Sequence, residues 1–329
     1  MTQLKPEQNA ALAVASPAPD EHPVARAASA HAVLEPAIAR LAAAVRTDRA
    51  RVLGAPDDPE AVHDFRVGLR RLRTLLRCAR PLYGETWTRR RLGEIARQAR
   101  ATSRLRDEEV LAETVRVVRV GSVTRGALAL WLAGRRAHQR SLRRAVIAEL
   151  GRRELDACLW RLGRRIARGP RRDWPAELFA AASLGHAYLI VAGRLSVGPD
   201  DGEGLHRLRI AFKRLRYTAE LLEAVGLGSA AGGVPALGAS CAEVAEHARE
   251  MQGALGHLHD LALAAGAVRR ARRLSRAERE QIAGALDRRR QRLARAAVRR
   301  LRQLGQSTPP PAAAVETPAA RDRGESRLL

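Results

Sequence analysis

Apolar residues recur every three or four positions along most of the chain, and few stretches alternate in the manner of a β-strand. This spacing places the apolar side chains on one face of a helix, and its persistence predicts an all-α fold. Glycine and proline interrupt the pattern and mark the helix ends. The predicted helices span 30–53, 59–80, 86–104, 108–119, 126–149, 153–168, 175–195, 203–224, 239–256 and 274–303.

The periodic pattern is missing at both ends of the chain. Residues 1–28 are rich in alanine, proline and small polar residues, and 305–329 contains a run of prolines. Such compositions bury too little apolar surface to fold, so both segments are predicted to be disordered tails. The start lacks the features of a signal peptide, and no apolar run approaches the roughly 20 residues of a membrane span. These features predict a soluble, cytoplasmic protein.

A segment in the first half of the chain matches a segment in the second half. When VHDFRVGLRRLRT (62–74) is placed over LHRLRIAFKRLRY (205–217), histidine falls on histidine, and each arginine of the first falls on arginine or lysine. A weaker match places 105–112 over 258–264 and aligns Asp107 with Asp260. The folded region, 29–304, is therefore predicted to contain two helical units, about 30–170 and 174–304, packed as pseudo-symmetric bundles.

Both matched segments carry a row of basic residues along one side of the predicted helix. Steps of three and four residues keep each row together, and an apolar row runs beside it, so each helix is predicted to be half-buried. The basic rows are His63, Arg66, Arg70, Arg73 and Arg77 in the first segment, and His206, Arg209, Lys213 and Arg216 in the second. On the same geometry, Arg71 and Arg214 point away from the rows.

The charge balance gives these rows a functional interpretation. Lys+Arg 59 against Asp+Glu 35 gives a net charge of +24, which predicts association with a polyanion. Charges about 5 Å apart repel by roughly 3 kcal/mol at an effective dielectric near 20, yet 65–84 and 207–219 contain no carboxylate. Acids on other helices could neutralise one such row. Its repetition favours a polyanion site, because guanidinium forks bind phosphate oxygens in pairs.

Two other functions stay open. Nucleic acid is also a polyanion, but aromatic residues make up only 3% of the chain, too few for an obvious stacking platform, and half-buried basic helices do not fit a groove. A polyphosphate-processing enzyme would need a few acids and a metal ion. The chain has no P-loop, GxSxG or HExxH motif. No catalytic residue, cofactor or metal is predicted, and His257 and His259 are assigned to a solvated helix junction.

The motifs quoted above resemble those of the CHAD family, an α-helical domain named for its histidine. The resemblance rests on EAVHDFRVGLRRLR (60–73), LRDEEVL (105–111), LHRLRIAFKRLRYTAELL (205–222) and MQGALGHLHDLALA (251–264). It implies two pseudo-symmetric bundles whose basic helices face each other across a central channel. It also implies binding of inorganic polyphosphate and, in some members, residence at polyphosphate granules; protein partners are not implied.

The resemblance also assigns residues to that channel. By position in the motifs, the channel would be lined by His63, Arg66, Arg70, Arg73, His206, Arg209, Lys213 and Arg216. Arg106 is added from the LRDEEVL motif. His259 stands where the second copy would repeat Arg106, so the role of that position is unsettled by the sequence.

Overall fold

The computed structural model describes residues 29–55, 57–229 and 240–307. Within these ranges the chain forms eleven α-helices and no strand, apart from one isolated bridge between Ser29 and Pro175. The predicted all-α fold is confirmed. The predicted tail at 1–28 and all but the first three residues of the tail at 305–329 lie outside the described residues.

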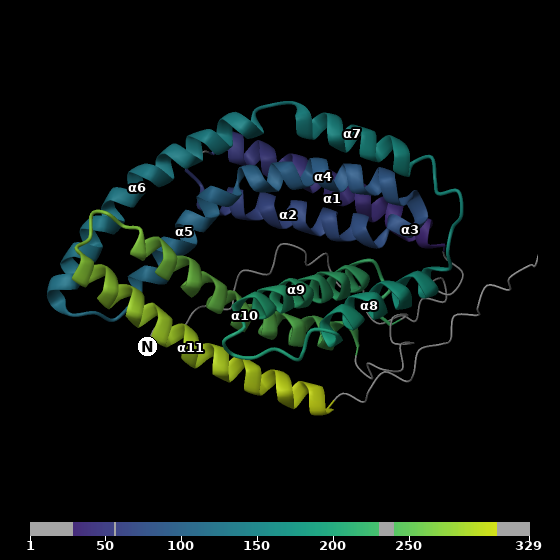
Figure 1. Ribbon diagram of the computed structural model, residues 1–329. Coiled ribbons are helices and arrows are strands. Elements are labelled where there is room, and N and C mark those ends of the chain that lie inside the picture. The colour runs from purple at the N-terminus through teal and green to yellow at the C-terminus, as the bar shows by residue number, and fades with distance from the viewer. Residues whose placement is uncertain (1–28, 56, 230–239, 308–329) are drawn as a thin grey trace, which may run out of the picture.

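The helices fall into two layers that face each other (Figure 1). In chain order the first seven are α1 (Ala30–Gly54), α2 (Pro59–Cys78), α3 (Arg80–Tyr83), α4 (Glu85–Ala101), α5 (Ser103–Arg116), α6 (Ser122–Leu150) and α7 (Glu154–Ile166). The remaining four are α8 (Ala176–Ala192), α9 (Gly202–Ala224), α10 (Cys241–Arg269) and α11 (Arg276–Ser307). One layer holds α1, α2, α4 and α7, and the other holds α8, α9 and α10.

The two layers meet where α2 packs on α9, and α5 packs on α10 at a second junction. One apolar cluster surrounds the first junction, and a second cluster fills the space between α5, α6, α10 and α11. Each cluster contains residues from both halves of the chain. The two halves also meet where α6 contacts α11. The predicted division into units 30–170 and 174–304 stays a prediction.

Local sequence explains why α2 and α9 form where predicted. Asp58 caps α2 by accepting from the amide of Glu60, and Pro59 takes the first helical position. Asp201 caps α9 in the same way, through the amide of Gly204. The apolar rows beside the basic rows are buried, and each such side chain contributes about 1.5–3 kcal/mol. These rows are Val62, Phe65, Leu69, Leu72 and Leu76, and Leu205, Leu208, Phe212 and Leu215.

Several predicted helix ends differ from the structure by two to four residues, and two boundaries differ by more. The prediction ended a helix at 256, but α10 continues to Arg269 because Leu258 and Leu261 keep its apolar face buried beyond Gly256. The histidines at 257 and 259 therefore lie within a helix and not at a junction. The second boundary concerns α5. The prediction began this helix at 108, but it starts at Ser103, directly after a break at Thr102.

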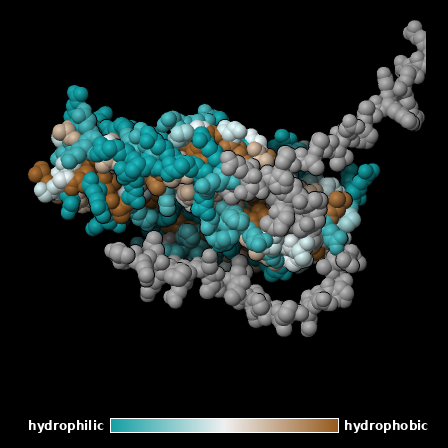
Figure 2. All heavy atoms as spheres, turned by 90° about the horizontal axis from the view of Figure 1, so that it is seen from below, coloured by the Kyte–Doolittle hydropathy of each residue, from teal (hydrophilic) through white to brown (hydrophobic). Residues whose placement is uncertain are grey.

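The face of the molecule seen from below is predominantly polar. Hydrophilic residues cover most of the described part of this face, with smaller apolar patches among them (Figure 2). Over the ranges that the structure describes, none of the helices combines the length and the hydropathy required to cross a lipid bilayer.

Candidate functional site

A tyrosine joins the two basic helices at the layer junction. Arg70 on α2 donates a hydrogen bond from Nη1 to the hydroxyl of Tyr217 on α9. The guanidinium carbons of Arg70 and Arg216 each lie 5.2 Å from the centre of the Tyr217 ring, within cation–π range. Tyr217 therefore holds arginines from both helices in fixed positions.

Lys213 lies at the centre of the positive charge. Burial and the nearby charges of Arg70, Arg209, Arg66 and Arg73 lower the pKa of Lys213 to about 7. All four charges are positive, and among the described residues no carboxylate counters them at this ammonium group. Near neutral pH, both the charged and the neutral form of Lys213 are therefore populated. An anion placed beside the ammonium group would stabilise the charged form.

Arg73 and Arg77 extend this charge along α2. Burial lowers the pKa of Arg73, with further contributions from Arg100 and Arg70. Burial also lowers the pKa of Arg77 to about 10, and the charges of Arg73 and Arg214 add to the effect. The Nε of Arg73 is buried and has no hydrogen-bond partner among the residues that the structure describes. A buried donor left unpaired costs about 1–3 kcal/mol, so it is a ready contact for an oxygen-rich ligand.

The helix break at Thr102 positions Arg66. The Thr102 hydroxyl accepts a hydrogen bond of 2.7 Å from Arg66 Nη1, and the Ala99 carbonyl accepts a second of 3.4 Å. Burial lowers the pKa of Arg66, and the charge of Arg70 acts in the same direction, whereas Asp107 opposes it. The break between α4 and α5 thus supplies backbone and hydroxyl acceptors that orient one arginine of the α2 row.

These contacts define a central cluster of six side chains from two helices. The central cluster is Arg66, Arg70, Arg73 and Arg77 from α2, and Arg209 and Lys213 from α9. Every member was predicted from the sequence. The positive charge of each member lowers the pKa of another member, or its own pKa is lowered by another member's charge. The cluster spans about 16 Å along α2, from eleven residues at 1.5 Å each.

Two histidines lie beside the Arg209 end of the central cluster. The ring centres of His206 on α9 and His259 on α10 are 4.8 Å apart. The Nδ1 atom of His206 is buried and has no hydrogen-bond partner within the described ranges. Burial and the charges of Arg209 and His206 lower the pKa of His259, which favours its neutral form. His206, the histidine of the second row, therefore lies at the candidate site, and His259 lies beside it.

Carboxylates are mixed with bases at this same end. Arg106 lies 3.5 Å from Glu109, so the predicted contribution of Arg106 is shared with an acid. Burial raises the pKa of Asp260, and the charge of Asp107 adds to this, while Arg209, His257 and Arg106 lower it. The positive field is consequently weaker here than at Lys213.

Two predicted site residues stand apart from the central cluster. Arg216 is paired with Glu220 at 2.7 Å, and Glu220 also binds Arg249 at 3.1 Å. His63 is exposed and makes none of the contacts that join the cluster in the described part of the chain. The surroundings of His63 and Arg216 thus differ from those of the six residues in the central cluster.

The sequence did not identify three residues that shape this site. Arg214 was set aside on helical geometry, yet its charge acts on Arg77. Arg100 on α4 acts on Arg73 across the helix pair. Tyr217 directly follows the basic row of α9, but its link to Arg70 depends on how α2 and α9 pack. An aromatic residue at the end of an arginine row is the signal that could have found it.

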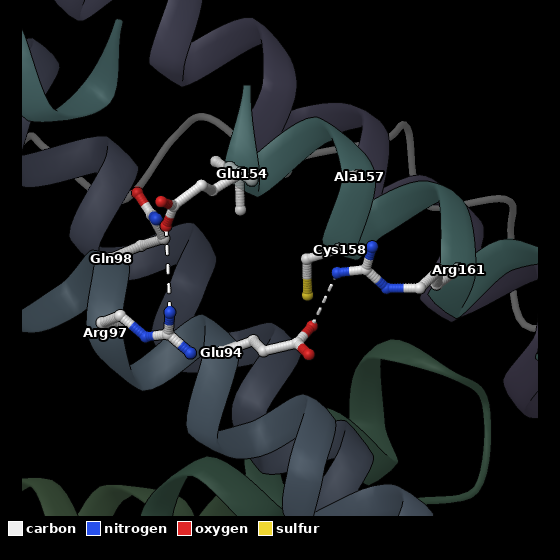
Figure 3. Close-up of a pocket in the computed structure, with 8 residues that line it drawn as sticks. Glu94, Arg97, Gln98, Glu154, Ala157, Cys158 and Arg161 are labelled. Carbon is white, nitrogen blue, oxygen red and sulfur yellow. Dashed lines mark hydrogen bonds and ion pairs between the residues drawn. The ribbon is translucent and has the colours of Figure 1, made fainter. Parts of the chain in front are cut away.

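A pocket between α4 and α7 shows the opposite arrangement of charge (Figure 3). Its volume is about 210 Å³. Its arginines face carboxylates: Arg161 lies 3.2 Å from Glu94, and Arg97 lies 3.9 Å from Glu154. Burial and Glu94 raise the pKa of Cys158 in its wall to about 12, so this thiol is a poor nucleophile. An anion would have to displace carboxylates here, unlike at the central cluster.

Replacing Tyr217 with phenylalanine tests how tightly the cluster is held. The ring and its contacts with Arg70 and Arg216 would remain, but the hydroxyl that accepts from Arg70 would be lost. We expect the free energy of unfolding to fall by about 1 kcal/mol, measured by urea denaturation. Tyr188→Phe is the matched control, because it removes a partly buried phenol hydroxyl that makes no hydrogen bond within the described residues. Equal effects of both substitutions would contradict the bridging role of Tyr217.

Comparison with known proteins matches this chain to one family. The family model of the CHAD domain matches residues 32–269. Among solved structures, the CHAD domain from the plant Ricinus communis is similar with a TM-score of 0.64 and 20% identity, over 87% of this chain and 94% of that one. PptA from Streptomyces chartreusis has a TM-score of 0.60 and 16% identity, over 84% of this chain and 100% of that one. No curated protein matches.

Proposed function

The chain belongs to the CHAD domain family, and from this premise we propose that it binds inorganic polyphosphate at the central cluster between α2 and α9. The family is linked to polyphosphate binding in general. The observation that carries the proposal for this chain is the setting of Lys213. This lysine is half-buried among four guanidinium groups, and no carboxylate in the described part of the chain counters its charge. The fold holds these five positive groups together despite their mutual repulsion. We take this as support for a site whose charge is balanced by a bound anion.

The chemistry of the cluster suits an extended chain of phosphates. Arginine presents two parallel donors to a pair of phosphate oxygens and stays charged. The cluster is elongated, so one long anion can satisfy several guanidinium groups that a single small anion could not reach together. Partial burial raises the strength of each contact, because charges interact more strongly away from bulk water.

Two buried donors are available to such a ligand. The Nε of Arg73 has no hydrogen-bond partner in the described part of the chain, and Nδ1 of His206, when it carries a hydrogen, can donate from the other end of the cluster. Each would gain a hydrogen bond on phosphate binding. Binding also relieves the repulsion around Lys213, so part of the affinity comes from removing an unfavourable interaction in the free protein. No covalent step is required for this function.

Titration calorimetry with long-chain polyphosphate at several salt concentrations tests the proposal. We expect affinity to fall steeply as salt rises, since each phosphate that pairs with a base releases counterions. Duplex DNA, single-stranded RNA and tripolyphosphate serve as competitors in the same assay. Long-chain polyphosphate should displace all three; preferential binding of DNA or RNA would refute the proposal and favour a nucleic-acid protein.

A further inference from the structure

The outward face of α4 carries a second set of arginines along an open groove. The groove has a volume of about 540 Å³. It is lined by Thr86, Arg89, Arg90, Gly93, Glu94, Arg97 and Arg100, and these residues define the α4 groove. Ile95 and Gln98 lie on the opposite, buried face of the helix. A Cβ atom added at Gly93 would meet no atom within 4 Å, so the floor of the groove is bare between its arginines.

The arginines of the α4 groove are weakly paired or unpaired. Arg89 and Arg100 are exposed and have no ion-pair partner in the part of the chain that the structure describes. Arg90 lies 3.7 Å from Glu94 with 77% of its side chain exposed, and Arg97 lies 3.9 Å from Glu154 with 60% exposed. Exposed pairs of this kind contribute about 0–1 kcal/mol, so a phosphate can replace them at little cost.

The single carboxylate among the residues that line the α4 groove makes its shorter ion pairs with arginines outside the groove. Glu94 binds Arg91 at 2.8 Å and Arg161 at 3.2 Å, on the side of α4 that faces α7. Its side chain is only 17% exposed. The charge presented to solvent along the groove is therefore positive, unlike the ion-paired pocket on the other side of Glu94.

The Arg100 end of the α4 groove lies close to the central cluster. The charge of Arg100 acts on Arg73 of the cluster. One residue before Arg100, the Ala99 carbonyl accepts from Arg66, which is also in the cluster. From Arg100 the groove runs along α4 to Arg89, about 16 Å for eleven residues. This proximity makes the groove a candidate for the part of a long phosphate chain that extends beyond the cluster near Arg73.

We propose that the α4 groove is a second phosphate-binding subsite, occupied only by polyphosphate chains too long for the central cluster alone. This inference rests on the proposed function. The subsite makes the protein selective for long chains: a short chain fills the central cluster, whereas a long one also pairs with Arg89, Arg97 and Arg100. The contacts with the α4 groove increase the affinity without a second ligand molecule, because the phosphates that occupy the groove belong to the same chain as those in the central cluster.

The double substitution Arg89→Glu with Arg97→Glu tests the subsite, because neither residue acts on the central cluster. We expect affinity for long-chain polyphosphate to fall about tenfold, since two contacts become repulsive. Affinity for tripolyphosphate should fall no more than in the control. The control is Arg292→Glu with Arg299→Glu on α11, two exposed arginines with similar spacing and no ion-pair partner in the described ranges. It changes the net charge equally.

The outcomes separate the subsite from the proposed function. A loss of long-chain affinity specific to the α4 variant supports the subsite. Equal losses in the α4 and α11 variants would show a general charge effect and overturn it, as would an unchanged long-chain affinity in the α4 variant. If the unaltered protein binds neither ligand, the proposed function itself fails. Circular dichroism of each variant verifies that the fold is retained.

Discussion

Replacing Lys213 with glutamate is expected to abolish polyphosphate binding while raising the melting temperature of the protein. The glutamate would lie among Arg66, Arg70, Arg73 and Arg209, where the lysine experiences only repulsion. A carboxylate there neutralises the site from within, so phosphate must compete with an intramolecular acid. We expect affinity to fall about a hundredfold or more, because reversing a buried charge at a binding site costs about 2–5 kcal/mol.

The rise in stability follows from the pKa of Lys213. A lysine side chain has an ordinary pKa of 10.5, whereas the pKa of Lys213 in the folded protein is about 7. Between these values the unfolded chain holds the proton and the folded chain does not, so stability falls as pH decreases through this range. At pH 7 the cost is on the order of 3–5 kcal/mol, taking about 1.4 kcal/mol for each pKa unit. Removing it should raise the melting temperature by about 5 °C or more.

Scanning calorimetry and titration calorimetry on two variants separate the effects. Lys213→Met also removes the buried charge, so it should stabilise the fold, but it adds no acid and should weaken binding less than Lys213→Glu. Arg288→Glu, on the exposed side of α11, should change neither property appreciably. A lower melting temperature in both Lys213 variants would show that the lysine does not destabilise the ligand-free protein.

Polyphosphate affinity is expected to decrease as pH rises from about 6 to 9. Bound phosphate favours the charged ammonium, so it raises the pKa of Lys213 above its value of about 7 in the free protein. Below pH 7 the lysine is already protonated and binding carries no extra cost. Above pH 7 binding must take up a proton, and the affinity falls by up to tenfold for each pH unit until the bound-state pKa is reached.

Lys213→Arg isolates this effect from other titrations. Arginine stays charged over the whole range, and Arg70 shows that it is used at the matching position of α2. The variant keeps the ligand and the histidines unchanged, so any remaining pH dependence belongs to them. The affinity of the unaltered protein should fall more steeply than that of the variant. Proton uptake, measured by calorimetry in buffers of different ionisation enthalpy, should be larger for the unaltered protein; parallel profiles would contradict the role of Lys213.

Local signals were sufficient to predict much of the fold and the central cluster. The caps at Asp58 and Asp201 and the apolar rows lie within or next to the helices they specify, so the ranges 59–80 and 203–224 differ from the structure by at most two residues. The basic rows follow from helical spacing alone. The all-α fold and the family followed from the same residues, whereas a channel and an internal repeat stay predictions.

The features that the sequence did not predict depend on packing between helices. The break at Thr102 is compensated by Arg66 from another helix, so no local pattern marks it. The predicted helix end at 256 falls inside α10, which continues to Arg269 because Leu261 and Val268 pack into the apolar cluster with α5, α6 and α11. Arg214 points away from the row on an isolated helix, yet the long side chain places its charge near Arg77. Side-chain reach and tertiary contacts decided these positions.

A crystal structure of the protein with bound polyphosphate tests the central claim most directly. We predict phosphate oxygens within hydrogen-bonding distance of Lys213, Arg70 and Arg73, in density that extends along α2. Tyr217 should keep its contact with Arg70. Phosphate bound only to exposed arginines, such as those on the outer side of α11, with the central cluster free of ligand, would contradict the account.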